Sequence, residues 1–166
     1  MTTKLSINGY KLSEALVQID LRMNDGEMLT GVLDELSRQR INLVYMTLLS
    51  ADMDGWDAAL AVTADAWPQA QPVIERFGVP SHTTVRSPVG TLTVFPHRSR
   101  PALLECVLGA FGKAGLPVYN IASSLSSLTF ATDYDLLEQA GGILQDKTRL
   151  PANYTPIRPQ WRVRQI

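Results

Sequence analysis

Residues 28–43 read MLTGVLDELSRQRINL, and residues 103–118 read LLECVLGAFGKAGLPV. In the first stretch one face of a helix is marked by the apolar spacing of Met28, Leu29, Val32, Leu33 and Leu36. The same spacing returns 75 positions later at Leu103, Leu104, Val107, Leu108 and Phe111. The two stretches therefore predict the same amphipathic helix twice.

The segments on either side of these helices keep the offset of 75. Before the helix, Val17 and Ile19 fall on Leu92 and Val94, which alternate as a half-buried strand does. After the helix, Ile41 and Leu43 fall on Leu116 and Val118. Three consecutive elements with one offset indicate a duplicated structural unit.

Each copy shows the order β-α-β-β-α-β. The first copy predicts helices near 27–39 and 68–76, with strands near 17–21, 42–49, 57–63 and 83–86. The second predicts helices near 102–114 and 135–146, with strands near 91–95, 117–122 and 128–132. We therefore predict an α+β protein of two tandem ferredoxin-like βαββαβ modules, each an antiparallel sheet with both helices on one face.

The predicted boundaries are 1–87 for the first module and 88–160 for the second. Residues 161–166 alternate as a final strand, which could return to the first module. The bare sheet face and the sheet edges of such modules are usually covered by another copy, so we expect a homodimer.

The composition of the chain excludes several classes of partner and indicates a cellular compartment. The hydrophobic fraction of 45% is sufficient for a core, and the formal net charge of −1 offers no footprint for nucleic acid or an anionic membrane. No apolar run approaches the ~20 residues that span a bilayer. The single cysteine, Cys106, excludes an internal disulfide and fits a reducing compartment. We therefore expect a cytoplasmic protein that binds neither nucleic acid nor membranes.

Four segments carry a resemblance to a known family. Residues 115–124 and 40–47 are similar to the helix-to-strand junction of ACT domains, and residues 126–133, SSLTFATD, are similar to the strand that follows it in aspartate kinases. The opening LSINGY at residues 5–10 also resembles the start of the regulatory tail of those enzymes. The chain thus resembles the C-terminal regulatory ACT pair of aspartate kinases, without a Lys-Phe-Gly-Gly-type phosphate loop.

The resemblance implies a regulatory unit, not an enzyme, that binds an amino acid or a related small molecule between modules. A metabolic enzyme is the other partner that it suggests. Carried over by position, the expected ligand-binding residues of the first module are Asn24, Asp25, Gly26, Glu27, Met28, Leu43 and Val44. Those of the second are Arg98, Ser99, Arg100, Pro101, Val118 and Tyr119. Lysine is not the expected ligand, because Val44 and Tyr119 stand where lysine-responsive relatives often have Asp.

Alternatives remain open at these positions. Residues 24–26 also suit an ordinary turn and helix cap, and Arg98 and Arg100 suit a solvated loop. The sequence contains no Walker loop, nucleophile elbow or spaced metal-ligand pair, so we expect no cofactor and no metal. Two further hypotheses are a ligand-free interaction module and a small acylphosphatase-like enzyme that uses Arg98 or Arg100.

Overall fold

The structure is a computed structural model that describes residues 4–24, 26–51, 55–77, 80–95, 101–124 and 126–152. The chain divides into two compact units. The first unit is formed by residues 15–88, and the second by residues 4–14 together with residues 89–152. The predicted final strand at 161–166 lies outside the described residues.

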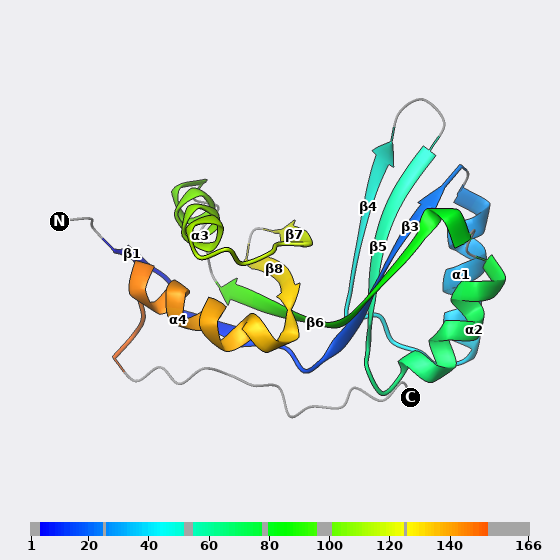
Figure 1. Ribbon diagram of the computed structural model, residues 1–166, viewed down its shortest axis with the longest axis horizontal. Coiled ribbons are helices and arrows are strands. Elements are labelled where there is room, and N and C mark those ends of the chain that lie inside the picture. The colour runs from blue at the N-terminus through cyan, green and yellow to red at the C-terminus, as the bar shows by residue number, and fades with distance from the viewer. Residues whose placement is uncertain are drawn as a thin grey trace. The chain divides into compact units, whose positions relative to one another are not determined.

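The first unit contains one four-stranded sheet with two helices. Its elements are β3 (Leu16–Met23), α1 (Gly26–Arg38), β4 (Tyr45–Ala51), β5 (Gly55–Thr63), α2 (Trp67–Phe77), a 3-10 turn at Pro80–His82 and the beginning of β6 (Thr83–Phe95). The strand order is β4-β5-β3-β6. Figure 1 shows α1 and α2 together on one side of this sheet.

The second unit has the same arrangement with different chain segments. The end of β6 is followed by α3 (Pro101–Lys113), β7 (Asn120–Ser123), β8 (Leu128–Asp133), a 3-10 turn at Tyr134–Leu136 and α4 (Leu137–Lys147). The N-terminal strand β2 (Gly9–Leu12) completes the order β7-β8-β6-β2. A two-residue strand β1 (Leu5–Ser6) pairs in parallel with β9 (Thr148–Arg149). The predicted tandem ferredoxin-like fold is therefore confirmed.

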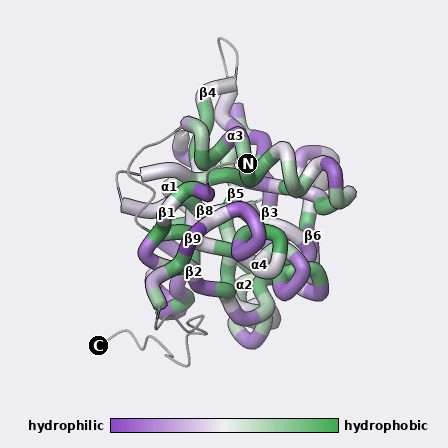
Figure 2. The backbone as a smooth tube through the Cα atoms, turned by 90° about the vertical axis from the view of Figure 1, so that its left-hand side faces the viewer, coloured by the Kyte–Doolittle hydropathy of each residue, from purple (hydrophilic) through white to green (hydrophobic). Residues whose placement is uncertain are grey.

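Each unit has its own hydrophobic core. In the first, alternate residues of β3 face the helices, namely Val17, Ile19, Leu21 and Met23, and they meet Val32 and Leu36 of α1. In the second, Leu92 and Val94 of β6 meet Val107 and Phe111 of α3. The alternation of hydrophobic and hydrophilic segments along the helices is visible in Figure 2. Burial of one stripe per helix is what holds each helix to its sheet.

The repeat is reproduced in detail at the ends of the first helices. Helix α1 spans Gly26–Arg38 and α3 spans Pro101–Lys113, an offset of 75 at both ends. Arg40 (φ 56°) and Gly115 (φ 70°) both adopt the left-handed conformation. The next residue then donates its N–H back to the helix, from Ile41 to the Leu36 carbonyl at 2.9 Å and from Leu116 to the Phe111 carbonyl at 3.0 Å. This is the Schellman type of helix end, made once with glycine and once without.

Two differences from the predicted elements concern how the strands connect and pair. The strands expected at 83–86 and 91–95 are one continuous strand, β6 (Thr83–Phe95), which runs through Pro88 without ending there. The N-terminal residues, which the sequence grouped with the first module, pair instead with β6 in the second unit, with Gly9 opposite Phe95 and Leu12 opposite Leu92. The reason is packing, since Tyr10 and Leu12 are buried in the second core.

Candidate functional site

The predicted loop of the first unit lies at the N-terminus of α1. Gly26 is the first residue of the helix, and Asn24, Gly26 and Glu27 are exposed to solvent. The Gly26 carbonyl accepts a hydrogen bond of 2.9 Å from the Thr30 hydroxyl, and a Cβ built on Gly26 would meet no atom within 4 Å. Met28 packs against the first core, so its side chain serves the fold. Asp25 lies outside the described residues.

The matching loop of the second unit is described only at its end. Pro101 is the exposed first residue of α3, where its lack of an N–H costs no helical hydrogen bond. Arg98, Ser99 and Arg100 lie outside the described residues. Their predicted role in capturing an anion therefore stays a prediction.

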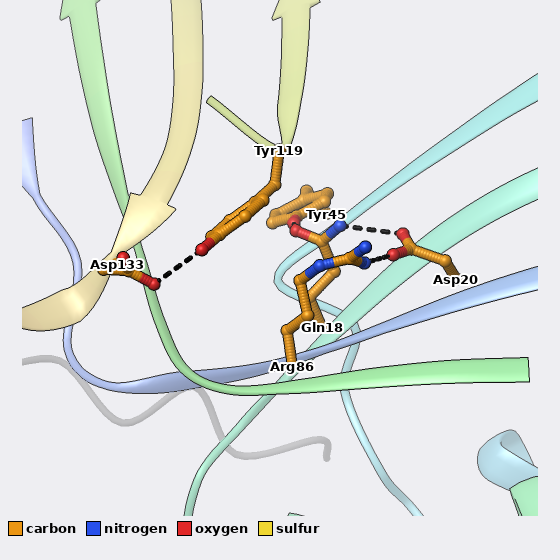
Figure 3. A network of polar contacts seen from close by, with 6 residues as sticks. All are labelled: Gln18, Asp20, Tyr45, Arg86, Tyr119 and Asp133. Carbon is orange, nitrogen blue, oxygen red and sulfur yellow. Dashed lines mark hydrogen bonds and ion pairs between the residues drawn. The ribbon is translucent and has the colours of Figure 1, made fainter. Parts of the chain in front are cut away.

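The predicted strand residues precede the strands rather than begin them. Leu43 and Val118 pack against the first and second cores respectively. Val44 is 45% exposed, and its N–H donates to the Ala61 carbonyl at 2.7 Å. Tyr119 is 36% exposed, and its hydroxyl donates to Asp133 at 2.8 Å (Figure 3). Both exposed residues thus lie near the start of an edge strand.

Strand register shows that Val44 and Tyr119 are not equivalent, although the offset of 75 matches them. Tyr45 lies opposite Ala61, whereas the equivalent residue of β8, Thr129, lies opposite Ala122. The second unit therefore has two more residues between its helix end and its second strand. The position that matches Val44 is Ile121, which is also exposed, at 37%.

The edge strand β4 carries an exposed apolar surface that sequence analysis did not single out. Within the described residues, no strand pairs with the side of β4 that faces away from β5. Met46, Leu48 and Leu49 are 43%, 39% and 68% exposed, and the seven residues of β4 include no charged side chain. Met46 and Leu48 lie on the helix side of the sheet, since their partners Leu60 and Ala58 are core residues, while Leu49 lies on the other side. Both faces of this edge are thus apolar.

A chain of polar contacts crosses the helix-free face of the first unit (Figure 3). The Tyr45 hydroxyl donates to Gln18 Oε1 at 2.5 Å, and Gln18 Nε2 donates to Asp20 Oδ1 at 2.7 Å. The other oxygen of Asp20 forms an ion pair with Arg86 of β6. We refer to these four residues as the polar link. It joins the edge strand β4 through β3 to β6.

Small residues in β5 make the polar link possible. Ala61 is the cross-strand partner of both Gln18 and Tyr45, so a methyl group separates two long side chains. Gln18 is fully buried, with 0% of its surface exposed. Burial also raises the pKa of Tyr45 well above its usual value, because the phenolate would lose its hydration. The sequence signal for this feature was a polar residue, Gln18, between two apolar strand positions, which alone does not identify its partners.

The part of the chain that the structure describes offers neither a metal-binding cluster nor a membrane-spanning helix. No group of three His, Cys, Asp or Glu side chains lies close enough there to hold a metal ion. No helix among the described residues is both long and apolar enough to cross a bilayer.

Comparisons with known proteins identify the fold. No protein-family model and no curated protein matches the chain. The ligand-free regulatory subunit of aspartate kinase from Thermus thermophilus superposes with a TM-score of 0.75 at 16% identity, over 87% of this chain and 100% of that chain. The regulatory subunit from Thermus flavus gives 0.74 at 16% identity, over 86% and 98%. The whole aspartate kinase from Synechocystis gives 0.75 at 13% identity, over 93% of this chain and 30% of that chain. The chain therefore has the fold of an aspartate kinase regulatory subunit, as the sequence motifs predicted.

Proposed function

We propose that this protein is a regulatory module that binds an amino acid or a similar small metabolite and has no catalytic activity of its own. The observation that carries the proposal is the fold, which matches regulatory subunits over their whole length. Neighbouring structures include an aspartokinase in complex with lysine and aspartate, so this fold occurs in proteins that bind amino acids. In this chain, Val44 offers no charge to a ligand ammonium group, which favours a ligand other than lysine.

The N-terminus of α1 is the part of the first unit best suited to hold a ligand carboxylate. The first N–H groups of a helix have no partner within the helix, and the helix dipole favours an anion there. Asn24 and Gly26 are exposed at this point, and the absence of a side chain on Gly26 leaves the backbone open to a ligand. We propose that the ligand carboxylate binds to these N–H groups.

The ligand proposal is tested by thermal shift with each of the twenty amino acids. We expect one or a few of them to raise the melting temperature of the parent protein, because binding to the folded state stabilises it. Gly26→Ala places a methyl group in open space, so the variant should fold but lose this shift. Gly109→Ala is the matched control, since a Cβ there also meets no atom within 4 Å and the site lies on α3. No shift with any amino acid, or an unchanged shift in Gly26→Ala, would contradict the proposal.

We propose further that two copies associate through β4. An unpaired strand edge can add a second strand, and an antiparallel pair of identical strands satisfies two-fold symmetry. No like charges would meet across such a pair, because β4 carries none. Its exposed leucines and methionine would be removed from water on pairing, which is favourable.

Mass measurement by light scattering tests the association. Leu49→Lys adds a charge at the most exposed apolar residue of β4, where the fold should tolerate it. We expect the parent to be a dimer and Leu49→Lys a monomer, with Ile121→Lys on β7 remaining a dimer. A parent protein that is monomeric, or a Leu49→Lys variant that stays dimeric, would refute association through β4.

A second function is favoured by the same edge. A strand that is apolar on both faces and bears no charge suits a protein partner better than a polar ligand. Under this alternative, the chain is a dimerisation or interaction module that acts on a metabolic enzyme without a ligand. The ligand-free alternative predicts a dimer that Leu49→Lys disrupts and a melting temperature that no amino acid raises. The ligand-binding function predicts the same dimer but a raised melting temperature with at least one amino acid.

A further inference from the structure

The polar link consists of Tyr45, Gln18, Asp20 and Arg86, which contact one another in that order. The hydrogen bonds measure 2.5 Å and 2.7 Å, and the Asp20–Arg86 contact is an ion pair between side chains that are about one-third exposed. The contacts form a continuous path from the edge strand β4 through β3 to β6. Since Gln18 is fully buried, its amide has no water to replace a lost partner.

The duplication supplies an internal comparison for this path. By the repeat offset of 75, Gln18 matches Thr93 and Asp20 matches Phe95 in the second unit. By strand register, Tyr45 matches Ala122. Among the described residues, a Thr93–Thr129 hydroxyl contact of 2.9 Å occurs at the equivalent place. The same fold thus forms without such a path. The polar link is therefore not a requirement of this sheet.

The polar link also occurs in the unit whose edge strand is long and apolar. Buried polar groups usually cost stability relative to well-packed apolar ones. The second copy buries the short Thr93 where the first buries Gln18, so the longer polar side chain has a role that folding alone does not explain. Tyr45 is the first residue of β4, and Arg86 lies on β6 two residues before Pro88, where the chain leaves the first unit. These positions suit a connection between the β4 edge and the strand that runs on into the second unit.

We propose that the polar link couples the β4 edge to β6, so that a change at the edge alters the part of β6 around Arg86. When Tyr45 moves, Gln18 must find another partner for its Oε1, and its amide can do so only by changing its contact with Asp20. Asp20 in turn holds the Arg86 guanidinium. The use of this coupling as a response to a bound copy or ligand rests on the proposed function, whereas the coupling itself does not.

A double-mutant cycle tests the coupling at any oligomeric state. Tyr45→Phe removes the hydroxyl and keeps the ring, and Arg86→Met removes the charge and keeps the stem. We expect Tyr45→Phe to raise the unfolding equilibrium constant in both backgrounds, as measured by urea titration. The factor of this increase should be at least threefold smaller in the Arg86→Met background than in the parent. Independent residues would show the same factor in both backgrounds, within the usual error of additivity, and that result would overturn the proposal.

The second unit provides a matched control for the cycle. Tyr10 Oη accepts a hydrogen bond from Gln145, so Tyr10→Phe also removes a tyrosine hydroxyl bonded to a glutamine, in the other unit. We expect its effect to be equal in the parent and in Arg86→Met. If Arg86→Met does not fold, Asp20→Asn takes its place, because it breaks the link at the preceding residue without changing size.

Amide hydrogen exchange gives a second test. If Tyr45 had a purely local role, Tyr45→Phe would leave the exchange rates in β6 unchanged. Under the proposal, Tyr45→Phe speeds exchange in β6 at residues 84–87, although Tyr45 lies on β4. Tyr10→Phe leaves these amides unchanged. Faster exchange confined to β4 and β3 would mean that the path ends at Gln18 and would overturn the coupling to β6. Failure of the proposed function shows instead as a missing dimer and a missing thermal shift, with the cycle still non-additive.

Discussion

The two hairpins β4–β5 and β7–β8 occupy equivalent places in the two units and differ at their outer strands. Strand β4 has seven residues, an apolar surface on both faces and no charge. Strand β7 has four residues and leads into serines whose hydroxyls bond within the turn, as Ser124 does to Ser127 at 3.1 Å. A short polar edge is a common way to prevent unwanted pairing, and a long apolar edge invites it.

The cores, by contrast, have changed little. The same helix faces are buried, the same helix ends are made, and the first strands meet the third strands in the same register. Divergence is concentrated in the outer strands and on the helix-free face of the first unit. The shared parts are therefore those that bury the cores and end the helices, and the divergent parts are those that determine the outer surface of each sheet.

The largest effect is expected in the matched cores. Phe111 and Leu36 occupy equivalent positions of α3 and α1, and Phe111 also makes an edge-to-face contact with Phe130 at 5.5 Å. Phe111→Ala should lower the free energy of unfolding by about 3–5 kcal/mol, and Leu36→Ala by about 2–5 kcal/mol. Urea unfolding measures both. Losses below about 1 kcal/mol would show that the two buried stripes do not hold the helices as described.

An intermediate effect is expected from a pair of tyrosines. Tyr45→Phe leaves a buried Gln18 oxygen without its donor, which should cost about 1–3 kcal/mol of unfolding free energy. Tyr119→Phe removes an exposed contact with Asp133 and should cost less than about 0.5 kcal/mol. Equal losses in the two variants would remove the distinction between the two hairpins.

The raised pKa of Tyr45 also predicts that the free energy of unfolding depends on pH. The pKa of Tyr45 is raised in the folded state, whereas an unfolded tyrosine has a pKa of about 10. The unfolded state therefore loses its proton first, and stability falls as the pH rises above about 10. Tyr45→Phe should reduce this alkaline loss, which urea unfolding at pH 9 and pH 11 measures. The parent and the variant losing equal stability over that range would contradict the burial of Tyr45.

The smallest effect is expected at the matched helix ends. Arg40 holds a left-handed backbone that glycine adopts without strain, so Arg40→Gly should gain up to about 1 kcal/mol. Gly115→Ala places a side chain in the same conformation and should lose about 1 kcal/mol. Thermal unfolding should therefore shift in opposite directions for the two variants. Shifts of the same sign would mean that the two helix ends are not equivalent.

The duplication, the element order and the ACT-like fold could be predicted because they depend on local periodicity, which the cores of both copies preserve. The offset of 75 located α1 and α3 to within one residue. Strand pairing is non-local, so local sequence patterns could not predict it. Strand β2 pairs with β6 in the second unit, and two extra residues shift Tyr119 away from the position of Val44.

The candidate site was only partly accessible to sequence analysis. The exposed N-terminus of α1 was predicted, because turn residues and the start of a helical stripe lie close together in sequence. The polar link was not, because Gln18 and Tyr45 meet only through Ala61 on a third strand. Exposure of Met46, Leu48 and Leu49 likewise depends on β4 lying at an edge, which follows from strand order and not from residue type.

The difference between the two edges is tested most directly by amide hydrogen exchange at increasing protein concentration. If β4 is the edge through which copies associate, the amides of β4 that point away from β5 become protected as the concentration rises, and those of β7 do not. Leu49→Lys should abolish this protection. Protection that appears in β7, or exchange in β4 that is independent of concentration in the parent protein, would contradict the account.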